Sequence, residues 1–259
     1  MTPDHASSKS HPDGEGCLLA IPAHRDLVRL KPFLVSLCET LEVSALRSVR
    51  VLVVDDGSPA GEQGALARFV EDLRPRYPFL LPAHVLFRNL GKGGAVRAGW
   101  DLGDGSRWLG FVDADGAVPA REVVRLMRLA ERGDGGCCYF ATRIRMLGYR
   151  VRRRTSRHLV GRAFATLSSL LLGIHVYDSQ CGLKIIPATA YARIRPLLVS
   201  SGYAMDVELV VALDATEIPM VEVPIDWEDV PGGKVSLLRD PWKMFLDLLA
   251  IRRRRRRWT

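Results

Sequence analysis

The amino-acid sequence predicts a single α/β domain whose mostly parallel sheet is doubly wound, with helices on both faces. Short apolar runs alternate with helix-length segments over the first half of the chain, and strands that alternate with helices form parallel sheets through right-handed crossovers. Two of the runs end in aspartates, as is typical where a ligand binds beyond the carboxyl ends of parallel strands. The 259 residues are 47% hydrophobic, which is sufficient for one large core.

The regular alternation occupies the first half of the chain. The run 17–21 is apolar and is closed by Pro22, and apolar residues then recur at helical spacing over 27–46. The same pattern continues beyond this first unit. Further strands are predicted at 49–54, 84–87 and 108–112, and further helices at 63–73, at 93–102 and from Pro119 to about 132.

The alternation becomes irregular after a strand predicted at 136–142. A basic loop without apolar periodicity covers 143–157, and long loops inside compact domains are more often functional than idle. The elements expected after it are helices at 158–172, 205–215 and 241–251 and strands at 183–186, 218–223 and 225–227. We divide the chain into a polar, disordered leader (1–16), one α/β domain (17–237) and an amphipathic helix with an arginine tail (238–259).

Composition indicates which cellular compartment and which kinds of partner suit this protein. The five cysteines are odd in number and lack paired metal-type spacing, which argues against disulfides and zinc and favours a reducing cytoplasm. The most hydrophobic stretch, 163–176, is shorter than the roughly 20 residues that cross a bilayer. The net charge of +8 is concentrated in the 143–157 loop and in Arg252–Arg257, so we expect anionic partners.

The strongest candidate for a metal site is Asp113-Ala114-Asp115, which follows the predicted strand 108–112. Residues two apart at a strand end project to the same side, so both carboxylates can share one hard cation such as Mg²⁺ or Mn²⁺. Such a cation stabilises a departing diphosphate. A solvated turn before a helix would have the same composition, but its position after a buried strand favours the metal site.

Two further motifs suggest a nucleotide-sugar site. Asp55 and Asp56 end the predicted strand 49–54 and can accept hydrogen bonds from a nucleoside, although an ordinary helix cap would look similar. The stretch 88–94 places glycines between Arg88 and Lys92 and can approach phosphates closely. Its spacing differs from that of a Walker loop, and a plain strand-to-helix connection is the alternative.

The basic loop 143–157 contains seven arginines, among them Arg143 and Arg157. Guanidinium groups bind phosphate bidentately, so a phosphorylated acceptor could bind here, whereas most charge runs are simply solvated. Polar residues farther along the chain are individually more typical of structural roles; they include Asp178, Gln180, Lys184, Asp206, Trp227 and Lys234.

Together these motifs resemble the family 2 glycosyltransferases of GT-A fold, specifically the polyprenyl-phosphate glycosyltransferases and most of all their dolichyl-phosphate β-glucosyltransferase branch. The likeness spans about 18–252. It rests on ordered motifs at 21–23, 53–58, 88–93, 113–116, 178–184 (Asp-Ser-Gln-Cys-Gly-Leu-Lys), 205–208 and 223–227. The resemblance implies a single GT-A domain, UDP-glucose as donor, a polyprenyl phosphate as acceptor and an inverting, metal-dependent transfer.

The resemblance also assigns roles to residues. It implies a catalytic role for Asp115, Arg143 and Asp206, and metal binding by Asp113 and Asp115. It implies nucleotide-sugar binding by Pro22, Asp55, Asp56, Arg88, Lys92 and Asp113, and acceptor-phosphate binding by Arg143, Arg157, Gln180, Lys184 and Lys234. The chain departs from the usual family pattern at His24-Arg25-Asp26, Gly116 and Gly233, which bears on the nucleoside contacts and on the donor sugar.

Acceptor chemistry supports a phosphate nucleophile. A phosphate monoester has a second pKa of about 6 and is largely ionised near neutral pH, so it can attack without a general base once it is positioned. A sugar hydroxyl would need a base, for which Asp206 and Asp178 are the candidates.

The C-terminal segment suggests peripheral binding to the cytoplasmic face of a membrane. Trp242, Phe245, Leu248 and Leu249 can lie among lipid headgroups while Arg252–Arg257 meet anionic lipids; the alternative is a helix packed on the domain. Three other functions stay open: transfer from GDP-mannose, transfer to a non-lipid acceptor, and a catalytically silent domain that binds membrane or RNA. Nucleic acid is not an expected partner because no aromatic residues interrupt the arginines.

Overall fold

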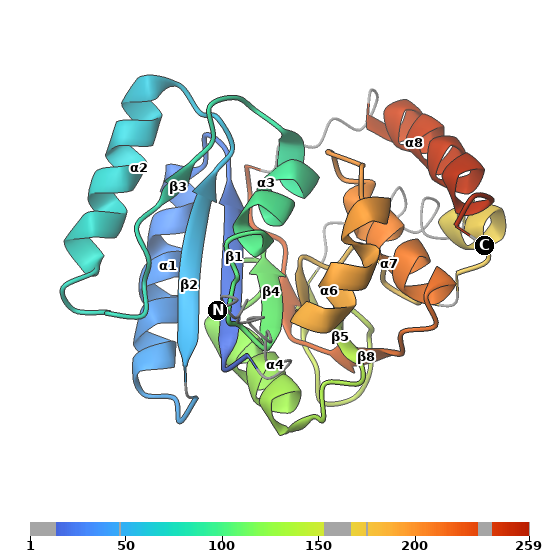
Figure 1. The fold of residues 1–259 in the computed structure, drawn as a ribbon. Coiled ribbons are helices and arrows are strands. Elements are labelled where there is room, and N and C mark those ends of the chain that lie inside the picture. The colour runs from blue at the N-terminus through green and yellow to red at the C-terminus, as the bar shows by residue number, and fades with distance from the viewer. Residues whose placement is uncertain (1–13, 47, 153–166, 175, 233–239, 259) are drawn as a thin grey trace, which may run out of the picture.

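The computed structural model describes residues 14–46, 48–152, 167–174, 176–232 and 240–258, and its centre is a seven-stranded sheet (Figure 1). The strand order is β3-β2-β1-β4-β7-β5-β8. Neighbouring strands are parallel except at β7, which runs antiparallel to both β4 and β5. The strands are β1 (Cys17–Ala23), β2 (Val49–Asp55), β3 (His84–Val85), β4 (Trp108–Val112), β5 (Cys138–Thr142), β7 (Leu183–Pro187) and β8 (Met220–Pro224). The predicted mostly parallel, doubly wound sheet is confirmed.

Helices cover both faces of the sheet and enclose two apolar cores. One core includes α1 (Leu27–Glu42), α2 (Ala60–Leu73) and α4 (Ala120–Arg132). The other includes α3 (Gly91–Trp100), α6 (Ala188–Ile194), α7 (Met205–Ala215) and α8 (Asp240–Arg255). Strand β1 shows how the sequence supports both cores: Leu19 and Ile21 face the first, and Leu18 and Ala20 face the second. Alternation of apolar side chains across a doubly covered strand produces the uninterrupted apolar run.

Several predicted boundaries match closely, and others differ for local reasons. Strand β4 and helix α7 have the predicted limits, whereas α2 begins three residues early, directly after Pro59. Helix α6, a seven-residue helix that starts immediately after β7, and a short 3₁₀ turn at Arg195–Leu197 were not predicted. Of the helix predicted at 158–172, only 167–172 lies among the described residues, and that part is helical.

The basic loop was wrongly predicted to lack regular structure. Strand β6 (Val151–Arg152) pairs in parallel with β9 (Trp227–Glu228) to form a small second sheet. Asp226 reinforces the pairing by accepting a 2.7 Å hydrogen bond from the backbone N–H of Arg150. A distant segment, which the local pattern of the loop does not reveal, therefore supplies the partner.

Helix α8 packs on the domain, at the opposite end of the molecule from α2 (Figure 1). Leu248 and Ile251 are fully buried in the core that contains α7, so the expectation that Leu248 lies among lipid headgroups is wrong. Two tail arginines are also engaged internally: Arg254 pairs with Glu208 and Arg255 pairs with Asp214. Among the described residues, no helix is both long and apolar enough to span a membrane.

Candidate functional site

The predicted donor residues converge at the carboxyl ends of β1, β2 and β4. Asp55 is the last residue of β2, and its neighbour Asp56 accepts a 2.6 Å hydrogen bond from the backbone N–H of Leu90. This bond joins the end of β2 to the glycine-rich turn that opens α3. Gly57 makes the approach possible, because it has φ +66° and a Cβ there would lie 2.3 Å from the backbone of Arg88 and Asn89.

Asp55 is buried behind this turn. Its Oδ1 accepts a 2.8 Å hydrogen bond from the backbone N–H of Ser58, whereas its Oδ2 is buried and has no hydrogen-bond partner among the described residues. A buried acceptor of this kind costs free energy unless something donates to it. Pro22 is half-buried in the same region, and Arg88 is exposed at its rim.

Lys92 connects the metal-binding candidates to the interior of the domain. Its Nζ lies 2.9 Å from Asp113 Oδ1 and 2.9 Å from Asp206 Oδ2. Asp206 Oδ1 in turn accepts a 2.6 Å bond from Lys184 Nζ, which also donates to the Cys181 carbonyl at 2.7 Å. The four side chains Asp113, Lys92, Asp206 and Lys184 form an alternating chain of charges, which we call the donor-side charge chain. Only its Asp113 end is substantially exposed.

Electrostatics stabilise the charged form of each central member. Burial opposes the ammonium of Lys92, but the carboxylates of Asp113 and Asp206 outweigh it and raise the pKa of that lysine. Burial likewise disfavours the Asp206 carboxylate, yet Lys184 and Lys92 together lower its pKa. Asp206 therefore has both oxygens occupied and is a weak base, which disfavours the general-base role considered for it.

Asp113 and Asp115 are held differently after β4. The backbone N–H of Asp113 donates to the Gly182 carbonyl at 2.8 Å, and a Cβ on Gly182 would come within 2.0 Å of Asp113 Oδ2. Asp115 Oδ1 accepts from the backbone N–H of Ala117 at 3.0 Å, and its Oδ2 lies 3.7 Å from Arg29 Nη1. Burial, and then the nearby Asp113 carboxylate, raise the pKa of Asp115.

This pair suits a hard divalent cation that also binds a phosphate. No cluster of three His, Cys, Asp or Glu side chains arranged for a metal occurs within the residues that the structure describes. Mg²⁺ does not require one, because it typically binds one or two carboxylates together with substrate phosphates and water. The side chains of Asp113 and Asp115 are 36% and 31% exposed, so their oxygens can reach a bound diphosphate.

Arg143 lies at the end of β5, on the predicted acceptor side. Its Nε and Nη2 donate to the two carboxylate oxygens of Asp178, both at 2.7 Å, and its backbone N–H donates to Oδ2 at 3.0 Å. Trp227 lies against the guanidinium, 5.3 Å from ring centroid to Cζ. Burial raises the pKa of Asp178, but Arg143 outweighs this and lowers it to about 2. We call Arg143, Asp178 and Trp227 the acceptor-side cluster.

The remaining predicted acceptor residues have different positions. Lys184 is fully buried, so direct contact with an acceptor phosphate is ruled out in this arrangement; its ammonium binds Asp206 instead. Gln180 is half-buried beside the acceptor-side cluster. Arg157 and Lys234 lie outside the described residues. The sequence analysis missed Glu222, whose carboxylate accepts from the backbone N–H groups of Tyr177 and Asp178 at 2.8 and 3.0 Å; a lone glutamate on a strand carries no recognisable signal.

Comparison with known proteins identifies the family. The model of glycosyl transferase family 2 matches residues 19–193, which is most of the chain. The chain belongs to this family. It is therefore a glycosyltransferase.

Curated relatives and solved structures agree with this assignment. The chain is 30% identical to dolichyl-phosphate β-glucosyltransferase of Saccharomyces cerevisiae, over 93% of this chain and 76% of that protein. It is 26% identical to the enzyme of the same name from Dictyostelium discoideum, over 96% and 78%. Glucosyl-3-phosphoglycerate synthase of Mycobacterium tuberculosis, solved with Mn²⁺, UDP and its product, superposes with a TM-score of 0.63 at 16% identity, over 92% and 80%. The predicted GT-A fold and glucosyltransferase resemblance are confirmed.

Proposed function

We propose that this glycosyltransferase moves glucose from UDP-glucose to the phosphate of a polyprenyl phosphate, with inversion at the anomeric carbon. The observation that carries the proposal is the donor-side charge chain: a lysine on a glycine-rich helix start contacts one of two carboxylates that follow the central strand. The names of the curated relatives support glucose as the sugar and a polyprenyl phosphate as the acceptor.

On the donor side, Asp56 and the turn that it holds contact the nucleoside, while Lys92 and Arg88 face the diphosphate. Asp113 and Asp115 would hold Mg²⁺ or Mn²⁺, which supplies positive charge where the leaving diphosphate becomes more negative. The mycobacterial structure with Mn²⁺ and UDP supports this choice of ions. Asp206 contacts Lys92, and Lys184 contacts Asp206. In this proposal neither residue touches the substrate, so both are positioning residues.

On the acceptor side, Arg143 binds the acceptor phosphate in an orientation set by Asp178 and Trp227. An oxygen of the ionised acceptor phosphate forms a bond to the anomeric carbon as the bond to UDP breaks, and UDP departs with that electron pair. No proton needs to be removed from the nucleophile. The weak basicity of Asp206 is consistent with such an acceptor, since a hydroxyl acceptor would require a base.

We also propose that the enzyme works at the cytoplasmic surface of an anionic membrane. Arg252, Arg253, Arg256 and Arg257 on the C-terminal segment are exposed, and Leu246 is a half-exposed apolar residue of α8. Arginines near an anionic surface contribute on the order of 1 kcal/mol each. Four exposed arginines are therefore sufficient for reversible peripheral binding.

The decisive experiment supplies the full chain with radiolabelled UDP-glucose or GDP-mannose, a polyprenyl phosphate, and Mg²⁺, Mn²⁺ or EDTA. Labelled lipid from UDP-glucose alone, abolished by EDTA and by Asp115→Ala, is the expected result. An exposed aspartate, substituted as Asp104→Ala, is the matched control and should retain full activity. Lipid labelled only from GDP-mannose would show that GDP-mannose, and not UDP-glucose, is the donor. Absence of labelled lipid with either donor would contradict a polyprenyl phosphate acceptor.

A further inference from the structure

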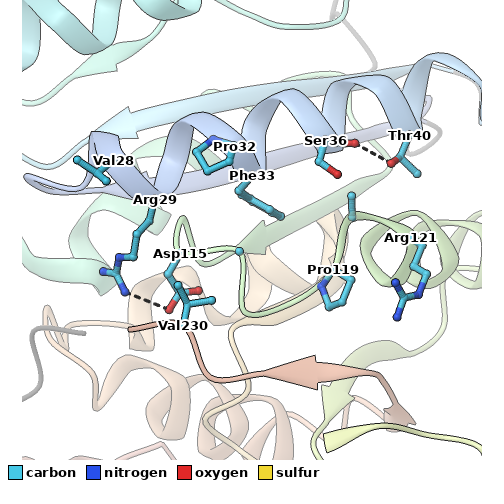
Figure 2. A pocket seen from close by; sticks show the side chains of 12 residues that line it. Val28, Arg29, Pro32, Phe33, Ser36, Thr40, Asp115, Pro119, Arg121 and Val230 are labelled. Atoms are coloured by element: carbon cyan, nitrogen blue, oxygen red, sulfur yellow. Dashed lines mark hydrogen bonds and ion pairs between the residues drawn. The ribbon is translucent and has the colours of Figure 1, made fainter. Parts of the chain in front are cut away.

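A groove of about 520 Å³ begins at Asp115 and runs along helix α1 (Figure 2). Arg29 and Asp115 lie at one end, and Ser36 and Thr40 lie at the other. Residues 29–40 of an α-helix span about 16 Å, and the volume is in the range of ordinary small-molecule sites. The groove is thus continuous with the proposed catalytic site and extends well beyond it.

The walls of this groove are mainly apolar. Val28, Pro32 and Phe33 contribute from α1, and Pro119 and Val230 face them from the other side. Val28 is 88% exposed, so its side chain is accessible to a ligand in the groove. At the inner end, Gly116 has φ +74°, a backbone conformation that favours glycine, and a Cβ there would lie in tight contact, 3.3 Å from Phe33 Cβ.

Polarity is graded along the groove. The Asp115 end contains the carboxylate and the guanidinium of Arg29, which are 3.7 Å apart. At the far end the hydroxyl of Thr40 donates to the Ser36 carbonyl at 2.6 Å, and the guanidinium of Arg121 pairs with Asp226. Both groups therefore have partners within the protein and require none from a ligand. A molecule that fits this gradient has a polar end at Asp115 and a hydrocarbon body.

Of the two substrates in the proposed function, only the acceptor has that form. Uracil, ribose and glucose are polar throughout, and the residues assigned to them, Asp56 and Lys92, do not line this groove. We propose that the groove binds the first isoprene units of the polyprenyl phosphate acceptor, with the phosphate at its Asp115 end. This inference rests on the proposed function and specifies where the lipid lies.

The test uses acceptors of increasing length: dimethylallyl phosphate, farnesyl phosphate and a long polyprenyl phosphate. Ser36→Trp should fill the far end of the groove and raise KM for the two longer acceptors about ten-fold, because displaced hydrocarbon returns to water. Its KM for dimethylallyl phosphate and for UDP-glucose should be unchanged. Glu39→Trp, on an exposed position of α1 outside the groove, is the matched control. Equal KM values for Ser36→Trp and wild type with every acceptor would overturn the proposal.

A binding readout separates failure of the groove from failure of the proposed function. Wild-type enzyme that glucosylates no prenyl phosphate would overturn the proposed function, but photolabelling can still locate the lipid. A benzophenone-tagged farnesyl phosphate should label a peptide that contains residues 28–40, and excess farnesyl phosphate should compete. Labelling confined to other peptides would overturn the groove assignment, whatever the transfer assay gives.

Discussion

The donor-side charge chain and the acceptor-side cluster both bury charge, but they bury it in different ways. In the donor-side charge chain, Lys92 is shared between Asp113 and Asp206, and Asp113 is partly exposed. In the cluster, one carboxylate takes three bonds from one arginine, and a tryptophan lies against the guanidinium. A shared ammonium can shift toward a new anion, whereas a bidentate guanidinium is fixed in orientation. The donor-side charge chain can therefore redistribute its charge, whereas the acceptor-side cluster holds its charge in place.

The largest effect is expected from Asp206→Ala, which breaks the donor-side charge chain at its buried centre. Lys184 is fully buried and would lose its only carboxylate described here, so the free energy of unfolding should fall by about 3–5 kcal/mol. Urea denaturation measures this loss of unfolding free energy. On the same helix, Asp214→Ala removes the half-exposed pair with Arg255 and should cost about 0–1 kcal/mol. Equal losses of unfolding free energy for the two variants would show that the buried charge chain contributes no more to stability than a half-exposed ion pair.

Lys92→Met tests whether the shared lysine serves the donor. The variant keeps the length of the side chain but removes the charge beside Asp113, so kcat/KM for UDP-glucose should fall roughly 10- to 100-fold, the value of a charged hydrogen bond. KM for the polyprenyl phosphate should change little. Steady-state kinetics with each substrate varied in turn distinguish these outcomes, and a selective rise in acceptor KM would contradict the division into two sides.

The acceptor-side cluster should have its own pH signature. The pKa of Asp178 is lowered from 3.8 to about 2 by Arg143, despite burial, so the pair stabilises the fold fully above the unfolded pKa near 4 and loses this contribution as pH falls toward 2. The contribution is about 2 kcal/mol. Wild type and Asp178→Asn should therefore differ by a constant amount between pH 5 and pH 7 and converge below pH 4. A difference in unfolding free energy at pH 2 as large as that at pH 6 would be inconsistent with the ion pair.

The smallest effect is expected far from both clusters, on the C-terminal segment. Charge reversal of exposed arginines, as in Arg252→Glu with Arg253→Glu, should weaken binding to anionic liposomes by on the order of 1 kcal/mol per position, with no loss of fold. Flotation at two salt concentrations measures the change. Truncation is a poorer test, because Arg254 pairs with the fully buried Glu208. Undiminished flotation of the double variant would show that these arginines do not contribute to membrane binding.

The site illustrates which contacts sequence patterns reveal. Asp113 and Asp115 were predicted because they directly follow a buried strand, and a strand end is a local feature. The pairing of Asp206 with Lys184, 22 positions apart, was not predicted, since neither residue lies in a motif that indicates a partner. A strand was predicted at 225–227, but its pairing with the basic loop, where β9 and β6 form the second sheet, was not.

The sequence by itself determined the strand-helix order of the first half of the chain, the mostly parallel character of the sheet and the acidic residues at its carboxyl edge, because these depend on periodicities within a few residues of one another. Tertiary structure decided which way β7 runs, how α8 buries Leu248, which carboxylate each lysine meets and where the groove beside Asp115 opens. Those outcomes depend on close packing between segments that are distant in the chain, and local periodicity carries no information about such contacts.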